Sequence, residues 1–382
     1  MHQLRREPFR ILFPLALLIG GAGMLPWLLF GRGLTRVWPG PFHSVTMTQA
    51  FLVAVAAGFL GTMVPRRSGG EPLSWLELAL LGVGTAAIPW LAWENRLLQA
   101  QLVFAGVLLV LAQFVVRRML ARRSPRPAPP SFVLIPLGLL CGLGGAALAI
   151  RFLHWRNPLW AFDLGRGLAQ QGLMLCLVMA LVPMLTPIFL TGEPPPDASP
   201  RKRLWMKAAY LLLGLAVIAS FFVEHRRSVQ QGLYLRALAV TLAITVGSGI
   251  WASATRRGLH RVLYRLALIA LPASLFAAGM NPLRRIPLLH LGFVAGLSLL
   301  VFAVSVHVTL LHTGREREAE QNRWPVALVG LITVAAAIVR IYAESFPRRY
   351  FESLTLASGL WLAGLLLWAA YLVPKLIRNP AK

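Results

Sequence analysis

Charged residues are scarce in this chain. They make up 13% of its 382 residues, whereas a soluble domain carries about 25%. Acidic residues are scarcer than basic ones, with 13 Asp and Glu against 38 Lys and Arg. Hydrophobic residues make up 57% of the chain, and its mean hydropathy is +0.67. The basic residues form short clusters between apolar runs, as in membrane proteins, and no basic patch is interleaved with aromatics. The composition therefore favours a polytopic membrane protein and gives no support to a nucleic-acid partner.

Cysteine is almost absent as well. Cys141 and Cys176 both lie inside apolar runs, and no CxxC or Cys/His cluster indicates a zinc or iron–sulfur site. We expect two small buried side chains. The first apolar run, 11–30, follows Arg5, Arg6 and Arg10 and is too long for the core of a signal peptide, so it is predicted to be a retained span.

About twelve apolar runs are long enough to cross a bilayer, which takes about 20 helical residues. They lie at 11–30, 44–64, 74–93, 97–116, 131–150, 168–190, 205–223, 232–252, 262–279, 287–311, 324–343 and 353–374. The sixth run is expected to be broken by Pro183 and Pro187. The prediction is an all-α bundle of about twelve transmembrane helices, a single membrane domain over residues 1–382.

The distribution of Arg and Lys predicts the orientation. Alternate loops, beginning with the N-terminal segment, hold the larger share, so both termini are expected in the cytoplasm. The segments 122–130 and 192–203 are rich in Arg and Pro or in Pro alone, and we expect extended, solvated linkers there.

Small residues mark one face of the second span. Its helical pattern places His43 and Met47 one turn apart at the head of a stripe formed by Ala50, Ala54, Ala57 and Gly61. Such a stripe lets another helix or a flat ligand approach the backbone. Imidazole and thioether groups both ligate metals, copper among them.

Three more histidines lie on the tenth span. His290 opens it at the expected outer face, and His307 and His312 lie near its inner end. His290 and His312 are 22 residues apart, which is about 33 Å along the helix axis. The spacing offers an outer pair, His43 with His290, if their helices adjoin, and an inner group that needs partners from other helices. Haem, held by axial imidazoles in an apolar interior, suits such sites. The alternative for each histidine is an ordinary polar group at a helix end.

Two arginines complete the candidate residues. Arg315 belongs to His312-Thr313-Gly314-Arg315, where Gly314 predicts a helix stop and the turn could contact an anion. Arg340 lies inside the eleventh span with Glu344 one turn on, which suggests an ion pair or a side chain reaching toward the membrane surface.

These motifs resemble the NnrS family, twelve-span bacterial membrane proteins that contain haem and copper and are linked to nitric oxide metabolism. The most specific stretches are 43–69 and the His312-Thr313-Gly314-Arg315 turn. Weaker ones are Pro8-Phe9-Arg10, His290 with Gly292 and Gly296, and Arg340 followed by Trp361, Tyr371 and Pro374. The resemblance favours haem binding through His43, His290 and His312. Met47 and His307 are further candidate metal ligands by their positions in the spans.

The chain departs from the family pattern at several positions. Val45 and Thr46 replace a histidine and a glutamate, Arg67-Ser68 replaces Trp-Thr, and His307 replaces an arginine. These changes weaken the expectation of copper more than that of haem and indicate a divergent member.

The leading prediction is an NnrS-like protein of a bacterial inner membrane that handles nitric oxide, whether by binding it or by turning it over. One alternative is a twelve-span secondary transporter without a metal cofactor, for which a broken sixth helix would be the best support. A third is a membrane scaffold or maturation factor, which the small supply of polar groups inside the spans allows.

Overall fold

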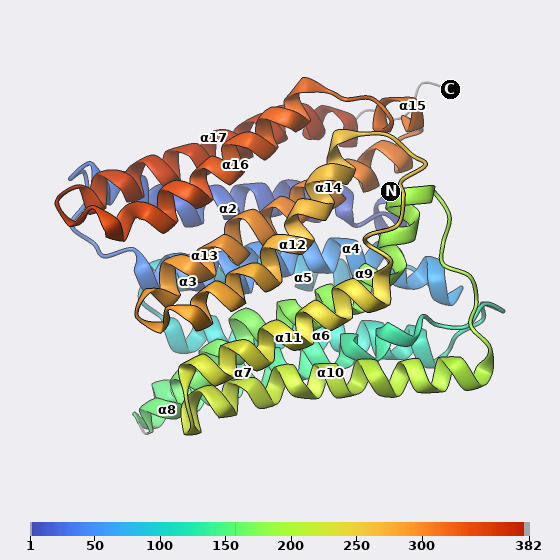
Figure 1. The fold of residues 1–382 in the computed structure, drawn as a ribbon, viewed down its shortest axis with the longest axis horizontal. Helices are drawn as coiled ribbons and strands as arrows, with labels where there is room; N and C mark the ends of the chain where they lie inside the picture. Colours follow the sequence, from blue (N-terminus) through green and yellow to red (C-terminus); the bar gives the residue numbers. More distant parts are fainter. Residues whose placement is uncertain (1, 157, 378–382) are drawn as a thin grey trace. The chain divides into compact units, whose positions relative to one another are not determined.

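The computed structural model describes residues 2–156 and 158–377, and helices account for most of them (Figure 1). Twelve helical segments in this part of the chain are long and apolar enough to span a membrane, as predicted. They are α2 (Phe9–Gly31), α3–η1–α4 (Gly40–Ser68), α5 (Trp75–Trp93), α6 (Leu97–Leu120), η2–α7 (Pro130–Trp155), α8–η3–α9 (Leu159–Thr191), α10 (Pro200–Arg226), α11 (Val229–Ser248), α12 (Leu259–Met280), η4–α13–η5–α14 (Pro282–His312), α16–η6 (Trp324–Ser345) and η7–α17 (Pro347–Ile377). The short helices α1 (His2–Arg6) and α15 (Glu316–Ala319) lie outside these spans.

The predicted break in the sixth span is wrong. Helix α9 (Leu173–Thr191) runs without interruption through Pro183 and Pro187. A helix among packed neighbours tolerates a proline. Ser131 Oγ also donates to the Ala180 carbonyl, 2.6 Å away, three residues before Pro183. The linker predicted at 192–203 is also too long, because Pro200 already begins α10 and suits the first helical position.

Within the described residues, three spans contain a π-helical segment in their first half. These segments are η1 (Thr46–Phe51), η3 (Leu168–Gly172) and η5 (Leu291–Ser298), in the second, sixth and tenth spans. Each of these spans ends at a glycine with positive φ, which terminates a helix without a Cβ clash: Gly69 (68°), Gly192 (85°) and Gly314 (67°). The same construction therefore recurs at every fourth span.

At the ends of two of these spans, one backbone carbonyl accepts two hydrogen bonds from a linker later in the chain. The Ser68 carbonyl accepts hydrogen bonds from the backbone N–H groups of Arg123 and Ser124, in the linker after the fourth span. The Leu190 carbonyl accepts from Thr255 and Arg256, in the linker after the eighth. The predicted linker at 122–130 is thus partly fixed by backbone hydrogen bonds.

The helices form two compact units. Unit 1 contains residues 1–23, 40–184 and 195–226, and unit 2 contains residues 24–39, 185–194 and 227–382. In unit 1 a buried ion pair joins Arg118 at the end of α6 to Glu77 in the first turn of α5, with nitrogen–oxygen distances of 2.7 and 2.9 Å. In unit 2, α16 (Trp324–Tyr342) and α17 (Tyr350–Ile377) pack side by side along their length (Figure 1).

The two cysteines are buried thiols, as expected from their apolar surroundings.

Candidate functional site

His43 lies in unit 1 at the start of the second span, three residues before the π-helical segment η1. Its Nδ1 is 3.0 Å from the carbonyl oxygen of Gly23 in α2, and the side chain is half-buried. A carbonyl oxygen can only accept, so Nδ1 carries the proton and Nε2 carries the lone pair in the neutral ring. This is the arrangement that metal-ligating histidines use to fix tautomer and ring orientation.

The side chain of Met47, four residues after His43, packs against Gly23. A methyl group at Gly23 would lie 2.8 Å from Met47 Sδ and 3.0 Å from Thr46 Cγ2, so only glycine lets the second span come this close. His43 and Met47 both face α2. The structure gives Met47 a packing role, with its sulfur against the α2 backbone.

Further along the small-residue stripe, Gly61 packs closely too. A methyl group there would lie 2.7 Å from Leu73 and 2.8 Å from Pro8. Ala50, Ala54 and Ala57 are fully buried. The stripe therefore lies in the interior of unit 1. The π-helical turn of η1 within it was not predicted, and π-turns inside helices are frequent at functional sites.

His290 in unit 2 has a local geometry like that of His43. Its Nδ1 is 2.7 Å from the Ile286 carbonyl oxygen, which again leaves Nε2 as the nitrogen with the lone pair. The next residue begins the π-helical segment η5. Just beyond, Gly292 and Gly296 face α12, where methyl groups would meet Ser274 Oγ and Leu271 Cδ2 at 2.3 and 2.7 Å. His43 and His290 thus both precede a π-helical turn and both have Nδ1 on a backbone carbonyl.

His307 pairs with a histidine that the sequence analysis missed. Its Nδ1 is 3.2 Å from Nε2 of His260 in α12, and both side chains are buried. Phe189 stacks on His307 with ring centroids 4.0 Å apart. His307 Nε2 is buried with no hydrogen-bond partner among the described residues. His260 was missed because the ninth span was predicted to begin at 262, whereas α12 begins at Leu259.

His312 is half-buried at the end of α14 (Leu299–His312), where the chain turns as predicted. The N–H of Arg315 donates to the Leu310 carbonyl at 2.8 Å, and that of Gly314 to Leu311 at 3.3 Å, which is the pattern of a Schellman cap.

After the turn, Arg315 lies 3.7 Å from Glu318 in α15. The Tyr371 hydroxyl donates to Glu318 at 2.9 Å, and Lys375 lies 3.4 Å from the same carboxylate. The turn is thereby joined to α17, and the Arg315 charge is opposed by a carboxylate.

Arg340 lies near the end of α16 and is half-buried. Its Nη1 is buried with no hydrogen-bond partner among the described residues, so the ion pair with Glu344, one of the two expectations for this side chain, gains no support there.

Metal-ligating residues do not gather into one cluster. In the described part of the chain, no three of His, Cys, Asp and Glu lie together in a way that could hold a metal ion. His43 and Met47 belong to unit 1, and His290, His307 and His312 to unit 2. His43 and His290, each with Nδ1 on a backbone carbonyl, could each offer one imidazole nitrogen to a metal by its own local geometry.

No curated protein matches this chain. The family model described as NnrS protein matches residues 3–379, nearly the whole chain, so the chain belongs to the NnrS family.

Proposed function

We propose that this protein binds haem in a bacterial inner membrane and handles nitric oxide. The observation that carries the proposal is the shared geometry of His43 and His290, whose Nδ1 atoms lie 3.0 and 2.7 Å from backbone carbonyls. Membership of a family associated with haem and copper adds to it. A bound haem would supply an iron atom that takes up nitric oxide. The chain supplies the imidazole, holds its tautomer through a carbonyl, and surrounds it with apolar helices.

His43 and His290 are equivalent candidates for the axial ligand, each by its own local geometry. Copper gains no support from the residues around them, because Met47 packs on Gly23 and Val45 and Thr46 stand where the family resemblance implies a histidine and a glutamate. The orientation we propose has the N- and C-termini in the cytoplasm, from the Arg and Lys bias of the loops; Arg378 and Lys382, which contribute to it, lie outside the described residues.

The test is the absorption spectrum of purified protein in detergent, oxidised and reduced, with and without nitric oxide. We expect a Soret band that shifts with nitric oxide and that disappears in His43→Ala, in His290→Ala or in both. His312→Ala tests the third candidate histidine in the same way, and Met47→Ala is the comparison variant, whose band should remain. A colourless protein from haem-replete cells would refute haem binding. In that case uptake of solutes into vesicles would test the transporter alternative.

A further inference from the structure

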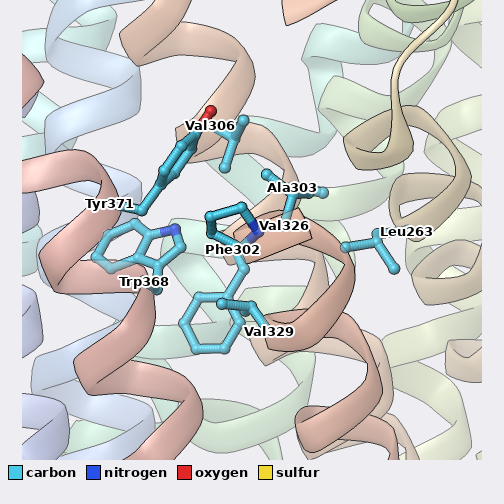
Figure 2. Close-up of a pocket in the computed structure, with 9 residues that line it drawn as sticks. Leu263, Phe302, Ala303, Val306, Val326, Val329, Trp368 and Tyr371 are labelled. Atoms are coloured by element: carbon cyan, nitrogen blue, oxygen red, sulfur yellow. The ribbon is translucent and has the colours of Figure 1, made fainter. Parts of the chain in front are cut away.

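The pocket in unit 2 among α12, α14, α16 and α17 is nearly filled by its own lining. Figure 2 shows Phe302, Val306 and Trp368 among the side chains around it. Its free volume is about 10 Å³, no more than a single water molecule requires. A different feature, an excess of positive charge, marks the ends of α4 (Leu52–Ser68) and α6 (Leu97–Leu120) in unit 1.

The end of α4 is bound to the linker that follows α6. The carbonyl of Ser68 accepts hydrogen bonds from the backbone N–H groups of Arg123 and Ser124, at 2.8 and 2.9 Å. Arg67 precedes the accepting residue, and Arg122 precedes the first donor. The backbone contacts therefore hold these two arginines in one region of unit 1.

Three arginines with like charges gather in this region, and we call Arg67, Arg122 and Arg126 the arginine junction. The charges of Arg122 and Arg126 act on Arg67, as does the charge of Asp197, which lies ahead of α10. Three positive charges and one negative charge leave an excess of two positive charges. Because Asp197 is exposed, water screens part of its attraction.

Neighbouring arginines on the same two helices already have carboxylate partners. Arg66 lies 2.8 Å from Glu7, and Arg118 lies 2.7 Å from Glu77. The chain has 13 acidic residues against 38 basic ones, so it supplies few further carboxylates. The charge of the arginine junction is therefore best compensated by a group from outside the chain.

The guanidinium groups of the junction also have unused donors. Arginines near a helix C-terminus often donate to the last carbonyls. Among the described residues, however, Arg67 Nε and Arg122 Nε and Nη2 are buried and have no hydrogen-bond partner. Both side chains are half-buried, so they lie against the protein while their outer parts stay accessible. An anion that reaches these outer parts would balance charges that the protein itself leaves unbalanced.

Phosphate is the anion that best suits this arrangement. The planar guanidinium group binds phosphate oxygens through two parallel hydrogen bonds, and basic clusters at the ends of membrane spans lie near lipid phosphates. Arg67 also stands where the family pattern has Trp, so this charge is a feature of the chain itself.

We propose that Arg67, Arg122 and Arg126 bind the phosphate group of an anionic ligand, which is a lipid headgroup or a phosphate compound in solution. The proposal does not depend on haem binding, because all three residues belong to unit 1 at the opposite end of the second span from His43.

The test measures binding to full-length protein in detergent. Native mass spectrometry compares phosphatidylglycerol, which is anionic, with zwitterionic phosphatidylcholine, and equilibrium dialysis measures inorganic phosphate. We expect tighter binding of phosphatidylglycerol, of inorganic phosphate, or of both. Preference for phosphatidylglycerol alone identifies a lipid headgroup, and binding of inorganic phosphate alone identifies a soluble ligand. No lipid preference together with no phosphate binding would overturn the proposal.

Matched variants locate the site. Arg67→Gln and Arg122→Gln should each weaken binding about fivefold, the typical contribution of one basic residue near a membrane surface. Arg256→Gln is the control, because it makes the same change of charge in the linker after the eighth span, where Arg256 is already paired with Glu320. An equal loss in Arg256→Gln would show a general attraction of anions and would overturn the assignment to the arginine junction.

Thermal unfolding separates binding from a structural role. Without ligand, Arg67→Gln removes a repelling charge and should leave the melting temperature unchanged or higher. The bound anion should raise the melting temperature of the wild type more than that of Arg67→Gln/Arg122→Gln. An equal rise in both proteins would contradict the proposal. Should the double variant fail to fold, the same comparison with Arg122→Gln, in the linker outside the helices, decides the question. None of these readouts uses a Soret band, so their failure leaves the haem proposal unaffected.

Discussion

Gly23→Ala is the substitution that tests most directly how this fold holds His43. The added methyl group would lie 2.8 Å from Met47 Sδ and 3.0 Å from Thr46 Cγ2. Alanine favours a helix over glycine by about 1 kcal/mol, whereas overpacking a buried site costs about 1–3 kcal/mol. The Met47 sulfur is in a flexible side chain and can move, but Thr46 is β-branched and stiff. We therefore expect a net loss of stability of about 0–2 kcal/mol.

The effect on His43 should exceed the effect on stability. Separating α2 from the second span lengthens the 3.0 Å contact between Gly23 O and His43 Nδ1, so the ring loses its orientation. Loss of such an orienting contact typically lowers metal affinity about 10–100-fold. If His43 ligates haem, Gly23→Ala should reduce haem retention by a factor in that range, measured from the Soret absorbance per protein during haem transfer to an acceptor protein.

Two comparisons make the reasoning refutable. Gly106→Ala introduces the same methyl group into α6 where no atom lies within 4 Å, so it should be neutral or slightly stabilising and leave haem retention unchanged. Adding Thr46→Ala to Gly23→Ala removes the clash with the stiff side chain and should restore much of the retention. If Gly23→Ala keeps full haem retention while His43→Ala loses it, the carbonyl contact does not position the ring. If Gly106→Ala loses as much, the effect is not local.

Three other predictions concern stability, measured by thermal unfolding in detergent. Glu77→Ala leaves Arg118 buried without its carboxylate and should lower the free energy of unfolding by about 3–5 kcal/mol. Asp163→Ala breaks an exposed ion pair and should lower it by at most about 1 kcal/mol. Equal losses in the two variants would contradict the argument from burial. Gly314 and Gly249 both have φ 67°, a left-handed conformation that alanine tolerates poorly. Gly314→Ala and Gly249→Ala should each lower the free energy of unfolding by about 1–2 kcal/mol, and Gly314→Asn should lower it less. An unchanged melting temperature in Gly314→Ala would show that the turn relaxes. His260→Leu leaves both ring nitrogens of His307 unpartnered. It should lower the free energy of unfolding by about 1–3 kcal/mol more than the double variant His260→Leu/His307→Phe does. A double variant as unstable as the single one would show that the two histidines do not act as a unit.

The twelve spans could be predicted from the sequence because the bilayer imposes a length and an apolar composition on each one. The stop at Gly314 was equally accessible, since glycine is favoured at positions where L-residues are strained. The end of the second span at Ser68, before Gly69, lies four residues beyond its predicted end at 64. The prolines of the sixth span misled the prediction, because a helix among packed neighbours tolerates a proline that an isolated helix does not. The π-helical turns could not be foreseen, because the extra residue rotates the following side chains around the helix, and a span that is apolar on nearly every side carries no pattern in which that rotation would show.

The sequence by itself determined which residues are candidates for the site, namely the few polar and ligating side chains in an apolar chain. Their roles depend on the tertiary structure. Gly23 lies twenty residues before His43 and offers its carbonyl only because α2 packs on the second span. His260 and His307 are 47 residues apart and pair because α12 and α14 pack together. Hydropathy records the solvent that each residue prefers, whereas hydrogen-bond partners and cavities depend on which helices become neighbours, and that is decided by packing over long sequence separations.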